Sequence, residues 1–115
     1  MQINQYEIWL ADLNPRVGTE PGKTRPVVVI QTNILNHISH PSTIICPITT
    51  NVQKESEILR IHLKKGTGNL LENCDIMLDQ LRAIDNKRLI KKIGALPLNL
   101  VDSVKENLSV ILDME

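Results

Sequence analysis

The sequence predicts a mainly β protein with one helix: a small, mostly antiparallel β barrel that carries a helix at its C-terminal end. Short apolar runs of strand length, separated by segments rich in Pro, Gly and Asn, recur between residues 7 and 96. The spacing then becomes helical, with apolar residues at Leu100, Val101, Val104, Leu108, Ile111 and Leu112. Aromatic residues make up only 2% of the chain, so we expect an aliphatic core of Ile, Leu and Val.

Three strands are expected in the first half of the chain. Glu7–Leu13 (EIWLADL) reads as a strand, and Asn14–Thr24 is a loop because it is rich in Pro and Gly. The β-branched run Arg25–Gln31 (RPVVVIQ) is typical of a buried central strand. Asn33–Ser42 is expected to be irregular with a short helical turn, and Thr43–Thr49 (TIICPIT) to be a second buried strand.

The second half is expected to add three strands and the helix. Leu59–Leu63 alternates apolar and polar residues, as a half-exposed strand does. Asp75–Ile84 reads as one long strand, and Ile90–Leu96 as a last short strand after a turn at Asp85–Arg88. Asn99–Leu112 is an amphipathic helix that should cover an open face of the sheet, and its first residue with Asp102 resembles a weak cap.

Two local features suggest a site. Hairpin loops usually have two to five residues, and the loop Asn14–Thr24 is about twice as long. It is also charged, with Arg16, Glu20 and Lys23. Pro47 lies inside an expected strand, where its missing N–H marks an edge, a bulge or a strand end. That irregularity would allow the following Thr49 and Thr50 to be aimed at a ligand.

Composition excludes several classes of protein. The chain has 115 residues and no repeat or linker, so we expect one domain over residues 1–115. Hydrophobic residues make up 42%, which argues against disorder. No apolar run reaches transmembrane length, and Met1–Gln5 has no secretion pattern. We therefore expect a cytoplasmic protein that does not contact a membrane.

The charged residues, cysteines and histidines form no pattern that predicts a particular ligand. Thirteen basic residues balance thirteen acidic ones, so a nucleic acid would need a local basic cluster. Cys46 and Cys74 lie far apart without a CxxC pattern, and we expect two reduced, partly buried thiols. His37, His40 and His62 are expected at the surface, and the sequence offers no constellation of metal ligands.

Four motifs in the expected order resemble the MazF/PemK toxin family. The segment Gly18–Gln31 (GTEPGKTRPVVVIQ) is similar to the family's G-[ST]-E loop followed by Arg-Pro and an apolar strand. Glu7–Pro15 looks like its first strand and the start of its loop. Pro47–Thr50 (PITT) is similar to its threonine motif, and Leu78–Asp85 (LDQLRAID) to its D/E-Q-x-R-x-I-D segment. The resemblance covers nearly the whole chain.

The sequence departs from this family at four places. Tyr6 stands where the family often has Gly. Asn33–Ser42 and Lys65–Asn73 are the least family-like segments. Met77 stands where PemK-like members have a basic residue, so a mechanism that depends on that residue does not carry over.

The resemblance implies a fold, an activity and partners. The fold would be the SH3-like barrel of the plasmid-maintenance toxins, and the protein a homodimer that acts as the toxin of a type II toxin–antitoxin system. It would cleave single-stranded mRNA at specific sequences in the dimer groove, with neither metal nor cofactor, leaving 2′,3′-cyclic phosphate and 5′-hydroxyl ends. A MazE-like antitoxin would bind it, and operator DNA would be reached only through that antitoxin.

The resemblance also assigns catalytic roles to Arg25, Thr49 and Glu20. Pro26 favours extended backbone at Arg25, whose guanidinium can grip two phosphoryl oxygens and stabilise transition-state charge. The alternative for this arginine is a salt bridge across the dimer. Thr49 would donate a hydrogen bond to a phosphoryl oxygen; the alternatives are an ordinary β-branched strand residue or Thr50 in its place. Glu20 would serve as a base or, as we favour, orient the arginine.

The predicted RNA contacts come from the charged loop and the two later motifs. They are Arg16, Lys23, Thr50, Asp79, Gln80 and Arg82. Asp79 is also a second candidate acid, Gln80 could read base edges, and Arg82 could stack on a base or bind phosphate. Each of these could equally be a polar residue on a half-exposed strand.

Two other functions remain open on the same fold. One is a CcdB-like toxin that binds DNA gyrase without catalysis, and the other is a degenerate homologue that binds only its antitoxin and DNA. The retained Arg25-Pro26 pair and Thr49 argue for the ribonuclease, since a gyrase binder needs no such site.

Overall fold

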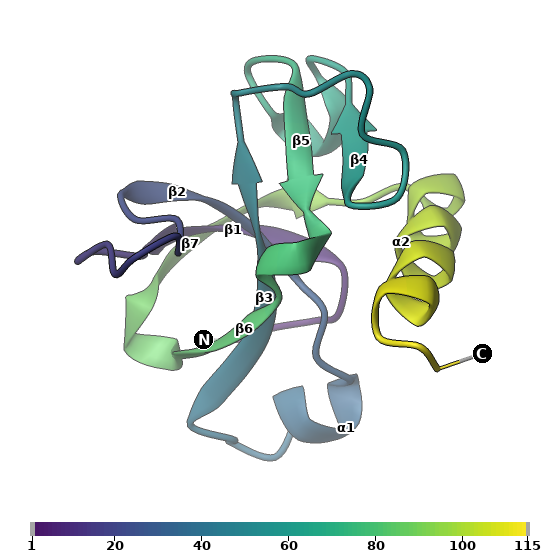
Figure 1. The fold of residues 1–115 in the computed structure, drawn as a ribbon. Coiled ribbons are helices and arrows are strands. Elements are labelled where there is room, and N and C mark those ends of the chain that lie inside the picture. The colour runs from purple at the N-terminus through teal and green to yellow at the C-terminus, as the bar shows by residue number, and fades with distance from the viewer. Residues whose placement is uncertain (1, 115) are drawn as a thin grey trace.

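A computed structural model describes residues 2–114, which form a strongly curved antiparallel sheet with a long helix packed on one side (Figure 1). The seven strands of that sheet are β1 (Glu7–Asp12), β2 (Thr24–Val29), β3 (Ser42–Thr49), β4 (Arg60–Leu63), β5 (Cys74–Met77), β6 (Arg82–Asp85) and β7 (Leu89–Ala95). The helices are α1 (Asn33–Asn36) and α2 (Leu98–Ile111). Three 3₁₀ turns complete the chain: η1 (Thr67–Asn69), η2 (Leu78–Gln80) and η3 (Asn86–Arg88).

The strands follow the order β4-β5-β3-β2-β1-β7, and β6 pairs with β3 beside this path. Every assigned strand pair is antiparallel. The prediction of a mostly antiparallel β fold with a C-terminal helix is therefore confirmed. A short helical turn was expected within Asn33–Ser42 and a turn at Asp85–Arg88, and α1 and η3 lie in these segments.

Strand β3 is the central strand of the sheet. On one side it pairs with β2, and on the other it pairs first with β6, over residues 42–45, and then with β5, over residues 48–49. Pro47 lies where the second partner changes, so its missing N–H interrupts a ladder that is already broken. Of the three alternatives expected at this proline, an edge, a bulge or a strand end, the edge and the strand end are wrong, because Pro47 lies inside a central strand. The irregular pairing that the proline indicated is present, as the change from β6 to β5.

The expected long strand Asp75–Ile84 is interrupted, so that prediction is wrong for its middle. Ile76 pairs with Ile48 in β3, whereas Ile84 pairs with Thr43. The two registers differ by three residues, which are the residues of η2. The chain loops out there because buried Leu78 turns inward, and this takes Asp79 and Gln80 out of the ladder.

Helix α2 begins at Leu98, one residue earlier than expected, and ends at Ile111. Its N-cap is Pro97, with no capping hydrogen bond from a side chain, so the predicted cap at Asn99 is wrong. Proline holds the extended backbone from which a helix can start, which replaces a polar cap here. The helix packs on β4 and η2 through Val101, Val104 and Leu108.

Two apolar layers lie on the two faces of the sheet. The layer under α2 contains Ile8, Val28, Ile48 and Ile76, and the layer on the opposite face is built around Trp9, with Val27 and Ile45 among its members. Apart from that tryptophan, Cys46, Cys74 and Met77, the buried hydrophobic residues are Ile, Leu, Val and Ala, which agrees with the predicted aliphatic core. No helix in the described part of the chain is long and apolar enough to cross a membrane.

Both cysteines are buried and free, as expected. Burial raises the pKa of the Cys46 thiol to about 12, with a smaller contribution from the charge of Asp79. Because the thiolate is the reactive form, Cys46 is an inert core residue.

Tyr6, the residue where the resembling family often has Gly, has a φ of 66°. This left-handed conformation costs a residue with a Cβ about 1–2 kcal/mol. The backbone there donates to Val29 O and accepts from Leu96 N, at 2.7 and 2.9 Å, and the ring packs on the core. The tyrosine therefore offsets part of its strain by covering the layer under α2.

Two valines of α2 provide a matched test of how the helix is docked. Val104 is fully buried, whereas Val110 is 45% exposed. Replacing either with Ala removes the same atoms and makes the same change in helix propensity. We expect Val104→Ala to lower the free energy of unfolding by about 2 kcal/mol and Val110→Ala to change it by less than about 0.5 kcal/mol. Urea denaturation measures both, and equal losses would contradict the packing described.

Glu7 supplies a pH test of the sheet. Burial raises the pKa of this carboxyl, but hydrogen bonds from Lys92, Asn4 and Trp9 outweigh burial, so the net pKa lies below its ordinary 4.5. A carboxyl with a depressed folded pKa stabilises the protein above its unfolded pKa, and that stability is lost as the pH falls through the folded value. We expect acid to destabilise the wild type more than Glu7→Gln, whereas exposed Glu106→Gln should follow the wild type. Denaturation followed by the fluorescence of the single tryptophan, Trp9, measures this.

Candidate functional site

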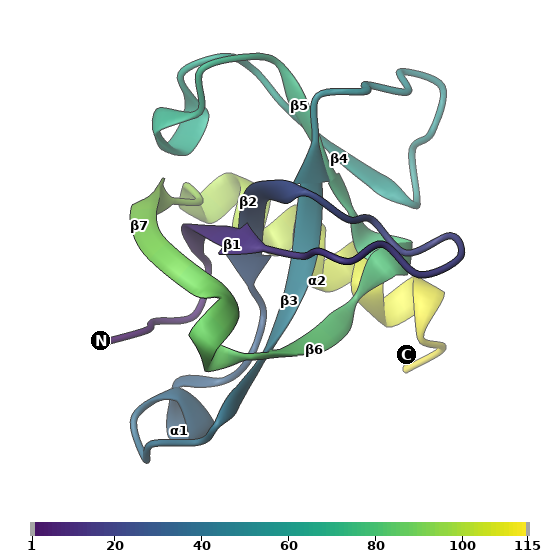
Figure 2. The same cartoon turned by 90° about the vertical axis from the view of Figure 1, so that its left-hand side faces the viewer.

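The long loop between β1 and β2 folds back on itself at its base. Leu13 N donates to Lys23 O at 2.9 Å, and Lys23 N donates to Asn14 Oδ1 at 2.9 Å. Gly22 is buried against Arg16, and a Cβ at this glycine would lie 2.7 Å from the Cβ of that arginine. The loop therefore needs glycine there in order to close. Figure 2 shows the closed loop reaching toward the segment between β5 and β6.

Arg25 lies at the start of β2, directly after this loop, and is half-buried. Its Nε donates to Gly22 O at 2.8 Å, which fixes the plane of the guanidinium. Among residues 2–114, its two terminal nitrogens have no hydrogen-bond or ion-pair partner. Burial, and secondarily the charge of Arg16, lowers the pKa of Arg25. The group still holds its proton at neutral pH and presents two free N–H edges to a ligand.

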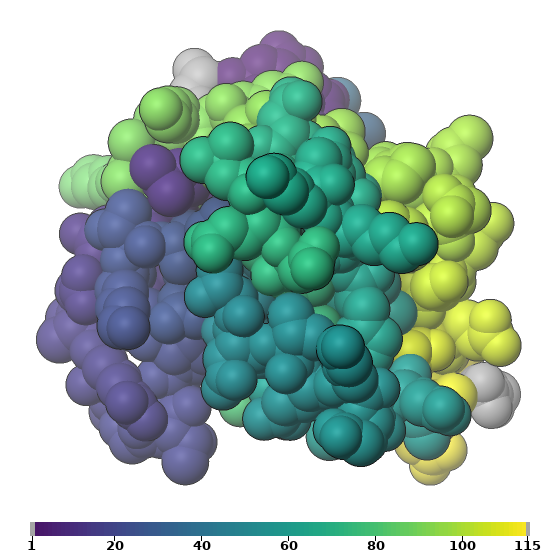
Figure 3. Space-filling model, turned by 90° about the horizontal axis from the view of Figure 1, so that it is seen from above, coloured from purple at the N-terminus to yellow at the C-terminus, as the bar shows by residue number. Residues whose placement is uncertain are grey.

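A hollow of about 430 Å³ opens beside this arginine, and the loop supplies most of its wall. Four predicted site residues line it together: Arg16, Glu20, Lys23 and Arg25. Met77, from β5, closes the other side. Figure 3 shows the blue-purple atoms of the β1–β2 region bordering the teal atoms that follow β3. Three cationic side chains and one carboxylate therefore share one concave surface.

Glu20 does not contact Arg25, contrary to the orienting role that we favoured. Its Oε2 lies 3.3 Å from Arg82 Nη1 at the start of β6, while the backbone carbonyl of Gly22 orients Arg25. The Glu20–Arg82 pair joins the β1–β2 loop to the strand that follows η2. A segment distant in the sequence thereby becomes part of the same site.

Thr49 ends β3 on the same face of the sheet as Arg25. The last assigned pair between β2 and β3 is Val27 with Pro47, and the same register continued by two residues sets Arg25 opposite Thr49. Residues that face each other across antiparallel strands share one side of the sheet. Thr49 Oγ1 accepts a hydrogen bond of 3.1 Å from Asn51 N, so its hydroxyl hydrogen is free to point at a ligand.

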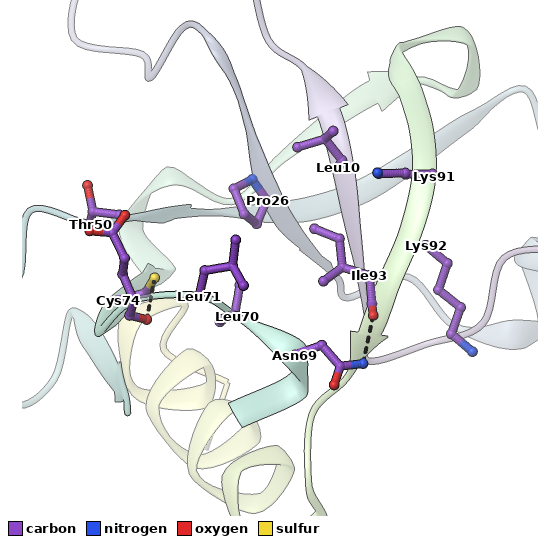
Figure 4. Close-up of a pocket in the computed structure, with 11 residues that line it drawn as sticks. Leu10, Pro26, Thr50, Asn69, Leu70, Leu71, Cys74, Lys91, Lys92 and Ile93 are labelled. Atoms are coloured by element: carbon purple, nitrogen blue, oxygen red, sulfur yellow. Dashed lines mark hydrogen bonds between the residues drawn. The ribbon is translucent and has the colours of Figure 1, made fainter. Parts of the chain in front are cut away.

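Thr50, the competing threonine, faces the other side of the sheet. It lines a second hollow of about 530 Å³ with residues including Leu10, Pro26, Leu70 and Cys74 (Figure 4). Most of that lining is apolar, although Lys91 and Lys92 of β7 border it. The register therefore puts Thr49, and not Thr50, on the face of the sheet that carries Arg25.

The remaining predicted residues come from the segment around η2. Asp79 is exposed and Gln80 is half-buried, both in the three residues that loop out of the ladder. Arg82 pairs with Ile45 across the sheet, which puts its side chain on the face that carries Arg25. The site thus combines the β1–β2 loop, the end of β3 and the start of β6.

Sequence reasoning missed a charged cluster next to Thr49. Asp75 is fully buried in β5 and stands opposite Thr49 in the register of β3 with β5. Arg60 Nη1 lies 3.1 Å from Asp75 Oδ2, and His62 Nδ1 lies 2.6 Å from Asp75 Oδ1. The available signal was an aspartate within the otherwise apolar Cys74–Met77.

The histidines differ partly from the surface positions expected. His37 is exposed, with Nε2 2.8 Å from Asn4 Oδ1, and His40 is half-buried with Nδ1 2.7 Å from Ser42 O. His62 is 42% exposed in its side chain, yet it is tied to the buried Asp75. The alternation of buried and exposed residues around His62 was predicted correctly, but its contact with Asp75 on the neighbouring strand was not predicted.

Comparisons with known proteins agree with this arrangement. Residues 4–112 match the family model described as PemK-like, MazF-like toxin of type II toxin-antitoxin system. The chain is 36% identical to Endoribonuclease EndoA of Bacillus subtilis (strain 168) over 112 residues, covering 97% of this chain and 96% of that protein.

Solved structures resemble the fold as well. The crystal structure of MazF from Deinococcus radiodurans superposes with a TM-score of 0.82 at 18% identity, covering 98% of both chains. A chain in the MazE–MazF structure from the same organism superposes with a TM-score of 0.78 at 19% identity, covering 100% of this chain and 99% of that one. With the family model matching nearly the whole chain, this protein belongs to the PemK-like, MazF-like toxins of type II toxin–antitoxin systems.

Proposed function

We propose that this protein is a metal-independent endoribonuclease that cleaves single-stranded mRNA at specific sequences. The observation that carries the proposal is the free guanidinium edge of Arg25, on the face that holds the Thr49 hydroxyl and beside a hollow lined by Arg16 and Lys23. Such a surface suits a phosphodiester, because planar guanidinium binds two phosphoryl oxygens at once. The kinship with Endoribonuclease EndoA supports the same activity.

The proposed reaction uses the 2′-hydroxyl of the RNA as nucleophile. Its oxygen bonds to the adjacent phosphorus while the bond from phosphorus to the 5′ oxygen breaks, which leaves a 2′,3′-cyclic phosphate. The 2′ proton leaves to a base, and the departing 5′ oxygen gains a proton and becomes a hydroxyl. The crowded phosphorane carries extra negative charge, which Arg25 and the Thr49 hydroxyl would stabilise by donated hydrogen bonds.

Glu20 is the proposed base. It is the one carboxylate among the residues that line the hollow, and Arg82 fixes its position by an ion pair of 3.3 Å. A base must lie within hydrogen-bond reach of the proton that it removes. In this role the Glu20–Arg82 pair would bring the acceptor to the edge of the site while Arg25 holds the phosphate.

The other contacts to RNA follow from chemistry and position. Arg16, Lys23 and Arg82 would bind phosphates near the hollow, and Asp79 and Gln80 on η2 would read base edges. Thr50 faces away from Arg25, so its predicted contact with RNA would have to lie on the side of the second hollow.

We further propose that the active protein is a homodimer and that a MazE-like antitoxin inhibits it. The MazE–MazF structure from Deinococcus radiodurans, whose toxin fold this chain shares, supports the second partner. The antitoxin would contact operator DNA, and the toxin would reach that DNA only through it. These partners would place the protein in the cytoplasm.

The first test incubates purified, antitoxin-free protein with a long defined RNA in EDTA and maps the new ends. The wild type is expected to cut at one short recurring sequence. Arg25→Ala should lower the cleavage rate at least about 100-fold, because removing one donor to a transition-state oxyanion costs 10²–10³. Arg25→Lys should recover only part of the rate, since ammonium keeps the charge without the planar fork.

Intact RNA across several sequences, from wild-type protein that is folded, would reject the ribonuclease. It would favour the CcdB-like alternative, a gyrase-binding toxin on the same fold. Cutting by the wild type that Arg25→Ala leaves unchanged would keep the activity but move the site elsewhere.

The two adjacent threonines give a matched second test. Thr49→Val should lower the single-turnover rate about 100-fold, because it removes a hydroxyl donor and keeps the β-branched shape. Thr50→Val makes the same change on the opposite face and should alter that rate less than about threefold. Rates measured at saturating RNA decide between them. A larger loss in Thr50→Val would show that the other threonine acts on the phosphate.

A further inference from the structure

A buried charged cluster holds the loop between β3 and β4, residues 50–59. At its centre is the carboxylate of Asp75, which is completely buried. Its Oδ2 accepts from Gln53 N at 2.8 Å and from Arg60 Nη1 at 3.1 Å, and its Oδ1 lies 2.6 Å from His62 Nδ1. One backbone group and two side chains of other segments therefore meet on one strand residue.

The same two side chains also hold the loop directly. Arg60 Nη1 donates to Asn51 O at 3.1 Å, and His62 Nε2 lies 3.0 Å from Ser56 O. With the bond from Gln53 N, the loop is tied at three points along its length. Each ring nitrogen of His62 thus lies within hydrogen-bond distance of an oxygen of another segment.

Asn51 connects this cluster to the candidate site. Its carbonyl is held by Arg60, and its N–H donates to Thr49 Oγ1 at 3.1 Å. That second bond occupies a lone pair of the threonine hydroxyl and leaves its hydrogen to point outward. Asp75 also stands opposite Thr49 in the sheet. A continuous path of hydrogen bonds thus runs from Asp75 through Arg60 and Asn51 to the hydroxyl.

We propose that Arg60 and Asp75 are positioning residues that hold the Thr49 hydroxyl toward the scissile phosphate, with His62 fixing the outer part of the same loop. This inference rests on the proposed ribonuclease activity and deepens it. A buried ion pair is a costly means of holding a loop, because both charges lose their hydration. Apolar side chains of similar volume often stabilise a protein equally well or better. Directed hydrogen bonds from a guanidinium are, in contrast, suited to fixing one peptide group in one orientation.

The test is a double-mutant cycle between Arg60→Met and Thr49→Val, with kcat and KM measured on the RNA cleaved by the wild type. Methionine keeps the length of the side chain and removes the donors. In the wild-type background we expect Arg60→Met to lower kcat about 10- to 100-fold with KM changed less than about threefold, because small misplacements of a reacting group cost that much. In the Thr49→Val background, the same change should lower kcat less than about twofold, because the hydroxyl that it positions is gone.

Two variants separate positioning from charge. Lys54→Met removes a cation from an exposed position of the same loop and should leave kcat unchanged. Arg60→Lys keeps the charge opposite Asp75 without the fork that reaches Asn51, and should recover less than half of the lost rate. Circular dichroism establishes folding for each variant. If Arg60→Met does not fold, His62→Leu, at a half-exposed position of the same cluster, enters the cycle in its place.

The outcomes separate this inference from the proposed function. If the wild type cuts no RNA, both are overturned. If the wild type cuts and the substitution lowers kcat equally in both backgrounds, or raises only KM, the positioning role is overturned and the ribonuclease stands. Loss of kcat confined to the background with Thr49 supports the inference.

Discussion

The double pairing of β3 is the constraint on which the rest of the structure depends. One strand pairs with β2 along one side and with β6 and then β5 along the other, and Pro47 lies where those partners change. Because register fixes which side chains share a face, this pairing puts Thr49 in line with Arg25 on one neighbour and Asp75 on the other. The end of this central strand is therefore where the three segments of the candidate site are brought onto one face.

One glycine and its backbone carbonyl, more than ion pairs, shape the β1–β2 loop that forms most of the first hollow. The closed β1–β2 loop depends on Gly22, whose missing side chain admits Arg16 and whose carbonyl fixes Arg25. A guanidinium fixed through Nε keeps its two outer nitrogens for a ligand. This arrangement is preorganised, which matters because donors that are already in place cost no rearrangement when charge develops.

Two irregular places in the backbone, the positive φ of Tyr6 and the three residues of η2 that leave the strand pairing, coincide with positions singled out by the resemblance to the family. Tyr6 adopts a left-handed conformation, which favours glycine, at the position where the resemblance led us to compare this chain with a glycine. The D/E-Q motif coincides with the three residues of η2 that leave the ladder. Within these three residues Leu78 packs on the core, whereas the polar Asp79 and Gln80 remain available to a ligand.

The sequence by itself determined the fold class, most of the apolar strands and the helix, and it supplied the main candidates for the site. Apolar period and residue type carry that information locally, and the ordered motifs added Arg25, Thr49 and Glu20. The exact extent of elements was less accessible. The break at η2 and the proline cap of α2 arise from how segments pack, which no local pattern records.

Only the tertiary structure decided which residues act together. Glu20 pairs with Arg82 and not with Arg25, and Thr49 rather than Thr50 lies on the face of the sheet that carries that arginine. The sequence marked Asp75 as a polar residue in an apolar strand but did not reveal its partners, because Arg60 and His62 come from another strand and meet it through the register of β4 with β5. Strand register is a long-range property, because it is set by how both faces of the sheet pack at once. The residue pattern of one strand therefore does not reveal which residue of a neighbouring strand lies opposite.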